Sequence, residues 1–171
     1  MSGHGEATVG RKGGQPVSRS IIIERPAHEV AQQFCDVDHH ERSGVHAGTS
    51  FHVIDQDDDH CDYEQLSRVG PSTIRQRFHL DRTDRLHQIN MVTGGSFQGG
   101  TLAFDIVETG VESAEVTATL TPPRTMATRL LGPVLRRLLG RSLAAALEED
   151  RDDLESGRYA SATTLRIRLE P

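Results

Sequence analysis

The chain has 171 residues and a formal net charge of -6, and aromatic residues make up only 4% of it, with no tryptophan. Proteins that bind nucleic acid concentrate Lys and Arg against the phosphates and stack bases on aromatic side chains, so this composition argues against a nucleic-acid partner. No run of about eighteen consecutive apolar residues occurs, which argues against an integral membrane segment. The length is typical of one domain with a substantial core.

The two ends of the chain differ in composition from its centre. Residues 1–17 are rich in glycine and polar residues and lack the apolar stretch of a signal peptide, so they predict a disordered leader. We expect one domain over residues 18–158 and a C-terminal tail over 159–171. Cys35 and Cys61 are then expected to be free thiols in a reducing compartment, the cytoplasm.

The ordered part begins with a strand and two short helices. The segment SRSIIIE, from Ser18, is short, apolar and β-branched, which favours a strand. Pro26 suits the first turn of a helix, PAHEVAQQFCD, in which Val30 and Phe34 share a face. A second short helix or turn follows through DHHERSG, and Gly44 ends it.

Six strand candidates follow, separated by turn-forming Asp, Gly and Pro residues. Apolar and polar residues alternate in several of them, which predicts an antiparallel sheet with one apolar concave face. The paired glycines at 94–95 and 99–100 are expected bulge sites, where the facing of a strand can change. The six candidates are residues 45–55, 60–69, 72–81, 85–93, 100–108 and 112–121.

The last predicted element is a long helix within residues 124–157. It carries two apolar lines, an arc wider than a helix needs to rest on one flat core, so we expect it to contact two surfaces. We expect the first line to face the sheet and a cavity and the second to face the neighbouring core or a partner. The first line is Leu131, Val134, Leu135 and Leu138, continued by Ser142, Ala145 and Ala146; the second is Leu139, Leu143, Leu147 and Leu154.

This element order, with the segments IIIERPAHEVAQQFCDVDHH and LLGPVLRRLLGRSLAAALEEDRDDLESG, resembles the START-like, or SRPBCC, superfamily over about residues 18–158. That superfamily includes polyketide cyclases and dehydratases, coenzyme Q-binding proteins and lipid carriers. The resemblance implies an α+β helix-grip fold: a curved seven-stranded antiparallel sheet, two short helices and a long C-terminal helix.

The resemblance also implies a hydrophobic tunnel between the sheet and the last helix, which holds a small apolar or lipid-like molecule without a bound cofactor. The residues expected to bind it are Ile74, Gln76, Phe78, Ile89, Met91, Leu102, Phe104, Leu138 and Ser142.

Five histidines lie within residues 39–60, with several aspartates around them. Imidazole and carboxylate groups are suitable ligands for zinc or iron, and His40 can approach His46 across a short turn. The spacing matches neither HExxH nor a Cys/His zinc pattern, so the prediction is no metal site. Two other interpretations remain open: the histidines line the polar mouth of a cavity, or they are exposed to solvent. For general acid-base chemistry the candidates are Tyr63, His46 and His52.

Arginines precede the acidic residues along the last helix, an order that opposes its macrodipole. A solvated face explains this order, and an alternative is transient contact with an anionic membrane through Arg129, Arg136, Arg137 and Arg141.

The leading functional hypothesis is binding or carriage of a small hydrophobic molecule by a monomer or homodimer. The alternatives are a polyketide cyclase or dehydratase-like enzyme that uses a tunnel His or Tyr, and a protein-interaction module.

Overall fold

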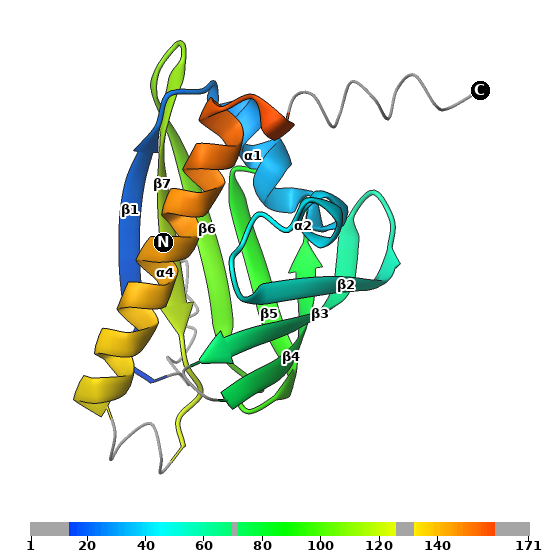
Figure 1. Cartoon of the computed structure of the whole chain (residues 1–171), viewed down its shortest axis with the longest axis vertical. Helices are drawn as coiled ribbons and strands as arrows, with labels where there is room; N and C mark the ends of the chain where they lie inside the picture. The colour runs from blue at the N-terminus through cyan, green and yellow to red at the C-terminus, as the bar shows by residue number, and fades with distance from the viewer. Residues whose placement is uncertain (1–13, 70–71, 126–131, 160–171) are drawn as a thin grey trace, which may run out of the picture.

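The structure is a computed structural model that describes residues 14–69, 72–125 and 132–159. It confirms the predicted α+β architecture, in which a curved seven-stranded antiparallel sheet is followed by a long helix (Figure 1). The elements are β1 (Val17–Ile23), α1 (Ala27–Cys35), α2 (Val37–Ser43), β2 (Thr49–Gln56), β3 (His60–Val69), β4 (Ser72–Asp81), β5 (His87–Gly95), β6 (Thr101–Gly110), β7 (Ser113–Thr121) and α4 (Gly132–Glu155).

The sheet has the strand order β1-β7-β6-β5-β4-β3-β2, and every neighbouring pair is antiparallel. Consecutive strands from β2 to β7 are therefore joined as hairpins, and β1 closes the row beside β7. In Figure 1, α4 crosses one face of this curved sheet, while α1 and α2 lie at the end where α4 finishes. None of the helices in the described part of the chain is long and apolar enough to cross a membrane.

The described residues extend slightly beyond the expected domain at both ends. Val17 already belongs to β1 and is buried, and the Gly14 amide donates to the Pro122 carbonyl at 2.7 Å, so the fold begins within the predicted leader. At the other end the Tyr159 ring is buried against His39. Residues 1–13 and 160–171, which carry most of the predicted leader and tail, lie outside the described residues.

One residue, Asp36, joins the two short helices. It follows α1 directly, and its carboxylate accepts a hydrogen bond from the His39 amide at 2.9 Å, which caps the start of α2. Gly44 ends α2 in the left-handed conformation, at a φ of 60° that favours glycine. This tight connection holds His39 and His40 next to the C-terminal half of α4.

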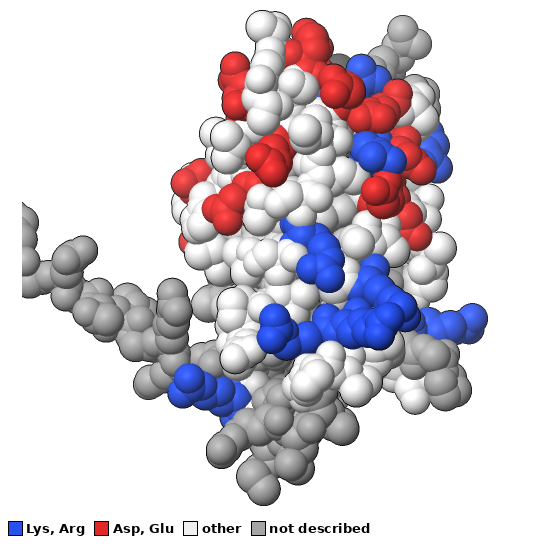
Figure 2. All heavy atoms as spheres, turned by 90° about the vertical axis from the view of Figure 1, so that its left-hand side faces the viewer, with Lys and Arg blue, Asp and Glu red and all other residues white. Residues whose placement is uncertain are grey.

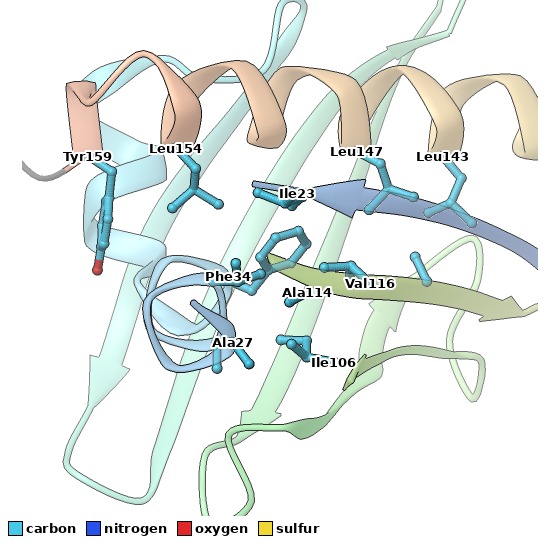
Figure 3. Close-up of a cluster of buried hydrophobic side chains, with 13 residues drawn as sticks. Ile23, Ala27, Phe34, Ile106, Ala114, Val116, Leu143, Leu147, Leu154 and Tyr159 are labelled. Carbon is cyan, nitrogen blue, oxygen red and sulfur yellow. The ribbon is translucent and has the colours of Figure 1, made fainter. Parts of the chain in front are cut away.

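The apolar core lies where α1 and the C-terminal half of α4 cover β1, β7 and β6. Figure 3 shows Leu143, Leu147 and Leu154 pointing from α4 toward the sheet, with Phe34 of α1 and Val116 of β7 in the same cluster. Burial of a large aliphatic side chain contributes roughly 1.5–3 kcal/mol, so these contacts fix the position of α4 across the sheet.

The two apolar lines of α4 share the core and the cavity between them. As expected, Leu143, Leu147 and Leu154 of the second line reach the core, and Ser142, Ala145 and Ala146 of the first line reach the cavity. Two features differ from the expectation: Leu139 of the second line also lines the cavity, and Val134 and Leu138 of the first line are exposed. Leu131 lies outside the described residues. Sequence periodicity defines the lines, but the side chains that contact α4 decide which residues of each line turn inward.

Candidate functional site

A cavity of about 340 Å³ lies between the concave face of the sheet and α4. Most of its wall is apolar, and the polar groups gather in a few places, which is the usual character of a small-molecule site. Its volume is at the small end of the range for such sites. The apolar wall includes Phe34, Val37, Phe51, Phe78, Val92, Phe97, Leu102, Phe104, Leu120, Leu139, Leu143 and Leu147.

Six of the nine residues expected to bind a ligand line this cavity. They are Ile74, Gln76, Phe78, Leu102, Phe104 and Ser142. The other three are not part of the wall: Leu138 is 47% exposed on α4, and Ile89 and Met91 are 38% and 49% exposed on β5.

Strand β5 faces the opposite way from the expectation, and its buried residues are the polar Gln88 and Asn90 together with Val92. Gln88 and Asn90 point inward, while Ile89 and Met91 between them point outward. The Gln88 side-chain NH2 group donates to the carbonyls of Ala31 (3.0 Å) and Arg85 (2.7 Å), which compensates the burial of this half of the amide, while its buried oxygen has no hydrogen-bond partner among the described residues. The alternation therefore predicts the strand correctly, but hydrophobicity selects the wrong face.

A break in the register between β4 and β5 lies close to an expected bulge. Phe78 pairs with Val92 and Arg77 pairs with Gly94, so β5 carries one additional residue at Thr93. Next to it, Gly95 has a φ of 95°, and a Cβ there would collide with the Arg75 carbonyl oxygen. Only glycine therefore fits at position 95, where β5 passes close to the backbone of β4.

Tyr63 is buried in the wall of the cavity. Its hydroxyl donates to Asn90 Oδ1 at 2.9 Å, and its ring stacks on Phe78 with centroids 5.1 Å apart. Burial raises the pKa of Tyr63 far above its usual value, so the phenol keeps its proton. Tyr63 therefore cannot act as a base, and because its single O–H donates to Asn90, its oxygen can accept a hydrogen bond from a molecule in the cavity.

His46 is the second predicted catalytic residue that reaches the cavity. Its Nδ1 lies 3.0 Å from Glu149 Oε2, and its Nε2 lies 3.4 Å from Asp150 Oδ1. The Ala47 amide donates to the other oxygen of Glu149 at 3.2 Å, which holds the carboxylate beside the imidazole.

His40 stacks on His46, with ring centroids 5.2 Å apart and an angle of 13° between the rings. Its Nδ1 lies 2.8 Å from the Asp36 carbonyl oxygen and its Nε2 lies 3.2 Å from Asp150 Oδ1. Burial by itself lowers the pKa of His40, but the hydrogen bond and charge of Asp150, together with the Asp36 carbonyl, more than offset this effect and raise the pKa above its usual value.

The remaining histidines of the 39–60 segment have other environments. His39 Nε2 contacts Asp153 Oδ2 at 2.8 Å behind the cavity wall. His52, the third catalytic candidate, is exposed on β2 and contacts Glu41 Oε1 at 3.2 Å. His60 stacks on His79 on β3 and β4, outside the cavity wall. The structure therefore brings His40 and His46 together and separates them from His52.

Asp150 and Glu149 were not expected at this site. Asp150 follows Leu143 and Leu147 and precedes Leu154 at spacings of four, three and four residues, so it lies on the buried stripe of α4. An acidic residue at an apolar position of a helix requires a buried partner, so the position of Asp150 in the sequence pattern could have identified it as a candidate site residue.

A basic surface lies along β1 and the N-terminal half of α4. It consists of Arg19 of β1 with Arg136, Arg137 and Arg141, which are exposed on α4. In Figure 2 a group of Lys and Arg side chains lies on the lower half of the face shown, and the Asp and Glu side chains lie on its upper half together with a few further Lys or Arg. Arg19, Arg136 and Arg137 line an open hollow of about 610 Å³. Arg129, which was expected to join them, lies outside the described residues.

No protein-family model matches the sequence, and no curated protein matches it. Solved structures do match its fold. A protein from Thermus thermophilus has a TM-score of 0.73 at 13% identity over 84% of this chain and 99% of its own. A START superfamily protein from Mycobacterium smegmatis has a TM-score of 0.71, also at 13% identity, over 84% of this chain and 99% of its own.

The Zhui aromatase/cyclase from Streptomyces sp. R1128 matches with a TM-score of 0.63 at 13% identity, over 82% of this chain and 95% of its own. Identities this low carry information about the fold alone, because one fold supports many unrelated sites. The chain thus has the helix-grip fold of START-like proteins.

Proposed function

We propose that the protein binds a small, largely apolar molecule in the cavity between the sheet and α4, as a binder or carrier. The observation that carries this proposal is the cavity of about 340 Å³, whose wall is mostly aromatic and aliphatic. The polar groups of the wall, such as Gln65, Gln76 and the Tyr63–Asn90 pair, offer hydrogen bonds that orient a ligand.

Native mass spectrometry of freshly purified protein tests whether a molecule co-purifies, and the fluorescent dye 1-anilinonaphthalene-8-sulfonate serves as the titration probe. Ala146 lines the cavity, so Ala146→Phe should fill part of it and weaken dye binding by about tenfold or more. Leu138→Phe is the matched control, since Leu138 is exposed on the same helix. Equal effects of the two substitutions, or no binding by the wild type, would contradict the proposal.

The second candidate is a cyclase-like enzyme, and the position of His46 favours it. The imidazole lines the cavity, and Glu149 orients its Nδ1. Such an arrangement suits proton transfer to or from a bound ketone. The aromatase/cyclase with the same fold makes this reaction class relevant, although the fold alone does not assign it.

A short poly-β-ketone thioester is the probe for this second candidate, with cyclised product measured by mass spectrometry. His46→Asn should lower turnover by about 100-fold, the usual contribution of a positioned acid or base. His52→Asn should leave turnover unchanged because His52 is exposed and is not part of the cavity wall. Retained turnover in His46→Asn would remove this residue from the mechanism.

We also propose that the basic surface of Arg19, Arg136, Arg137 and Arg141 contacts an anionic membrane during ligand loading. Arg136 donates to the neutral Gln15 side chain and Arg19 to the Ser18 carbonyl, so these partners, both without charge, leave the two positive charges uncompensated. Each basic residue near an anionic surface contributes about 1 kcal/mol, which salt screens.

Sedimentation with vesicles tests this contact. Wild-type protein should bind phosphatidylserine-containing vesicles at low salt, whereas Arg136→Glu with Arg137→Glu should bind about tenfold less. Arg75→Glu with Arg77→Glu is the control with the same charge change, on β4 beside Glu64. Binding to neutral phosphatidylcholine vesicles with equal strength would contradict the proposal.

We further propose the cytoplasm as the compartment. Cys35 and Cys61 are both free and buried, which is usual for thiols of proteins in a reducing environment. Cell fractionation tests this assignment.

A further inference from the structure

We propose that His40, His46 and Asp150 form a binding site for a divalent first-row transition-metal ion of the zinc class, at the wall of the cavity. One ligand atom from each of these residues lies within 4.8 Å of the others, and the group is the one such set in the described part of the chain. The proposal concerns the ion alone and does not depend on which molecule the cavity holds.

His40 is held in one tautomer by its backbone contact. Its Nδ1 lies 2.8 Å from the Asp36 carbonyl oxygen, and a carbonyl can only accept, so Nδ1 carries a proton. In a neutral imidazole the other nitrogen, Nε2, then has a lone pair. That lone pair faces Asp150 Oδ1 at 3.2 Å, and two acceptors at this distance need either a proton or a metal ion between them.

His46 has a similar pair of contacts, one from each ring nitrogen. Its Nδ1 faces the Glu149 carboxylate at 3.0 Å and is therefore a donor, which leaves Nε2 to face the same Asp150 oxygen at 3.4 Å. Two imidazole lone pairs thus converge on one carboxylate oxygen. Either both rings carry an additional proton, or one cation serves both nitrogens and the oxygen.

The separations fit a shared metal ion. Two ligands that each lie about 2.1 Å from a tetrahedral zinc ion are about 3.4 Å apart. The two nitrogen–oxygen separations, 3.2 and 3.4 Å, match this edge length. The two imidazole nitrogens lie within 4.8 Å of each other, and one ion at about 2.1 Å from both requires them to be no more than about 4.2 Å apart, so the proposal includes a turn of His46, the least buried of the three residues, toward His40.

The surroundings also suit a metal centre. A metal-bound histidine usually donates its other ring N–H to a carbonyl or carboxylate, and the Asp36 carbonyl and Glu149 accept these bonds here. The Gln33 amide donates to Asp150 Oδ1 at 3.1 Å and helps to fix the carboxylate. Two histidines and one carboxylate leave coordination positions free, and because all three residues line the cavity, these positions are open to a molecule within it.

The site has a charge balance that favours a divalent ion. With neutral imidazoles, Glu149 and Asp150 together carry two negative charges next to the two rings, and a divalent cation neutralises them. Asp153, one turn further along α4, is paired instead with His39 and Arg158 and does not contribute to this balance.

The test is isothermal titration of the chelator-treated, full-length protein with zinc chloride, with no other ligand present. Wild-type protein should bind one zinc ion per chain saturably, and His40→Gln with His46→Gln should bind about 100-fold more weakly. Glu149→Gln should weaken binding about tenfold because Glu149 acts through His46. Circular dichroism of each metal-free variant establishes that it is folded.

His60→Gln with His79→Gln is the matched control, because this second stacked histidine pair lies beside Asp62 outside the cavity. Zinc binding in this control should equal that of the wild type. The proposal is overturned if wild-type protein shows no saturable zinc binding, which would assign the cluster to protonated imidazoles, or if Asp150→Asn and the double histidine variant both bind zinc as the wild type does.

Discussion

Two neighbouring histidines of α2 are almost equally buried and have different surroundings. His39 is 6% exposed and His40 is 8% exposed. His39 contacts Asp153 and the Tyr159 ring in a packed region, whereas His40 shares Asp150 with His46 on the wall of the cavity. Burial therefore does not separate a structural histidine from a candidate site residue, but access to the cavity does.

The largest expected effect is the loss of the His39 side chain. In His39→Ala the carboxylate of Asp153, which is almost fully buried, loses its shortest contact in a packed region and keeps only Arg158 and Gln33, each at 3.5 Å, so we expect the free energy of unfolding to fall by about 3 kcal/mol. In His40→Ala, Asp150 keeps His46 and Gln33 and can gain water from the cavity, and we expect a loss of about 1–2 kcal/mol.

Urea unfolding of the two metal-free variants measures this difference, and the two substitutions remove the same side-chain volume from adjacent positions. If His39→Ala and His40→Ala lower the free energy of unfolding equally, then the packed region and the cavity wall do not differ as proposed.

Two leucines of α4 test the same difference between core and cavity wall, with a smaller expected effect on the free energy of unfolding. Leu154 belongs to the packed core, so Leu154→Ala should cost about 2–3 kcal/mol through lost contacts and a new void. Leu139 lines the cavity and already lacks neighbours on one side, so Leu139→Ala should cost about 1 kcal/mol or less. Thermal unfolding compares them, and a larger loss for Leu139→Ala would indicate that the cavity is filled in solution.

Of the predicted effects, the smallest on stability at neutral pH comes from the two thiols, which are tested by their labelling rates. Burial raises the pKa of Cys35 and of Cys61 to about 11, although the charge of Arg82 opposes this shift at both. Labelling of the folded protein by iodoacetamide at pH 8 should therefore be about 100-fold slower than labelling of the urea-unfolded chain. Cys61 belongs to the apolar cluster that includes the cavity residues Tyr63 and Phe78, so faster labelling of Cys61 than of Cys35 would show that small molecules enter from that side.

The same thiols make stability depend on pH above neutrality. Because the folded state binds their protons more tightly, the stabilisation is fully present below the unfolded pKa near 9 and is lost as the pH rises toward 11. The urea midpoint should accordingly fall between about pH 9 and 10.5. An unchanged midpoint in that interval in the wild type, with Cys35→Ser and Cys61→Ser as references, would contradict the assignment.

Individual residues show how far the sequence predicts the candidate site. Phe78 and Leu102 belong to the concave face as predicted, because their strands alternate between apolar and polar residues. The same prediction is wrong for Ile89 and Met91, because Asn90 and the NH2 group of Gln88 find hydrogen-bond partners inside the fold and occupy the face that apolar residues usually take. His46 is a candidate from its residue type, but its partners Glu149 and Asp150 lie more than 100 residues away in the chain.

The sequence by itself determined the order and type of the elements, because strand alternation, helical periodicity and turn residues are local properties of the chain. Only the tertiary structure decided the facing of β5, the rotation of α4 and the meeting of His40, His46 and Asp150. These depend on side-chain packing and on hydrogen bonds between distant segments, and several facings satisfy the same local pattern until those contacts form.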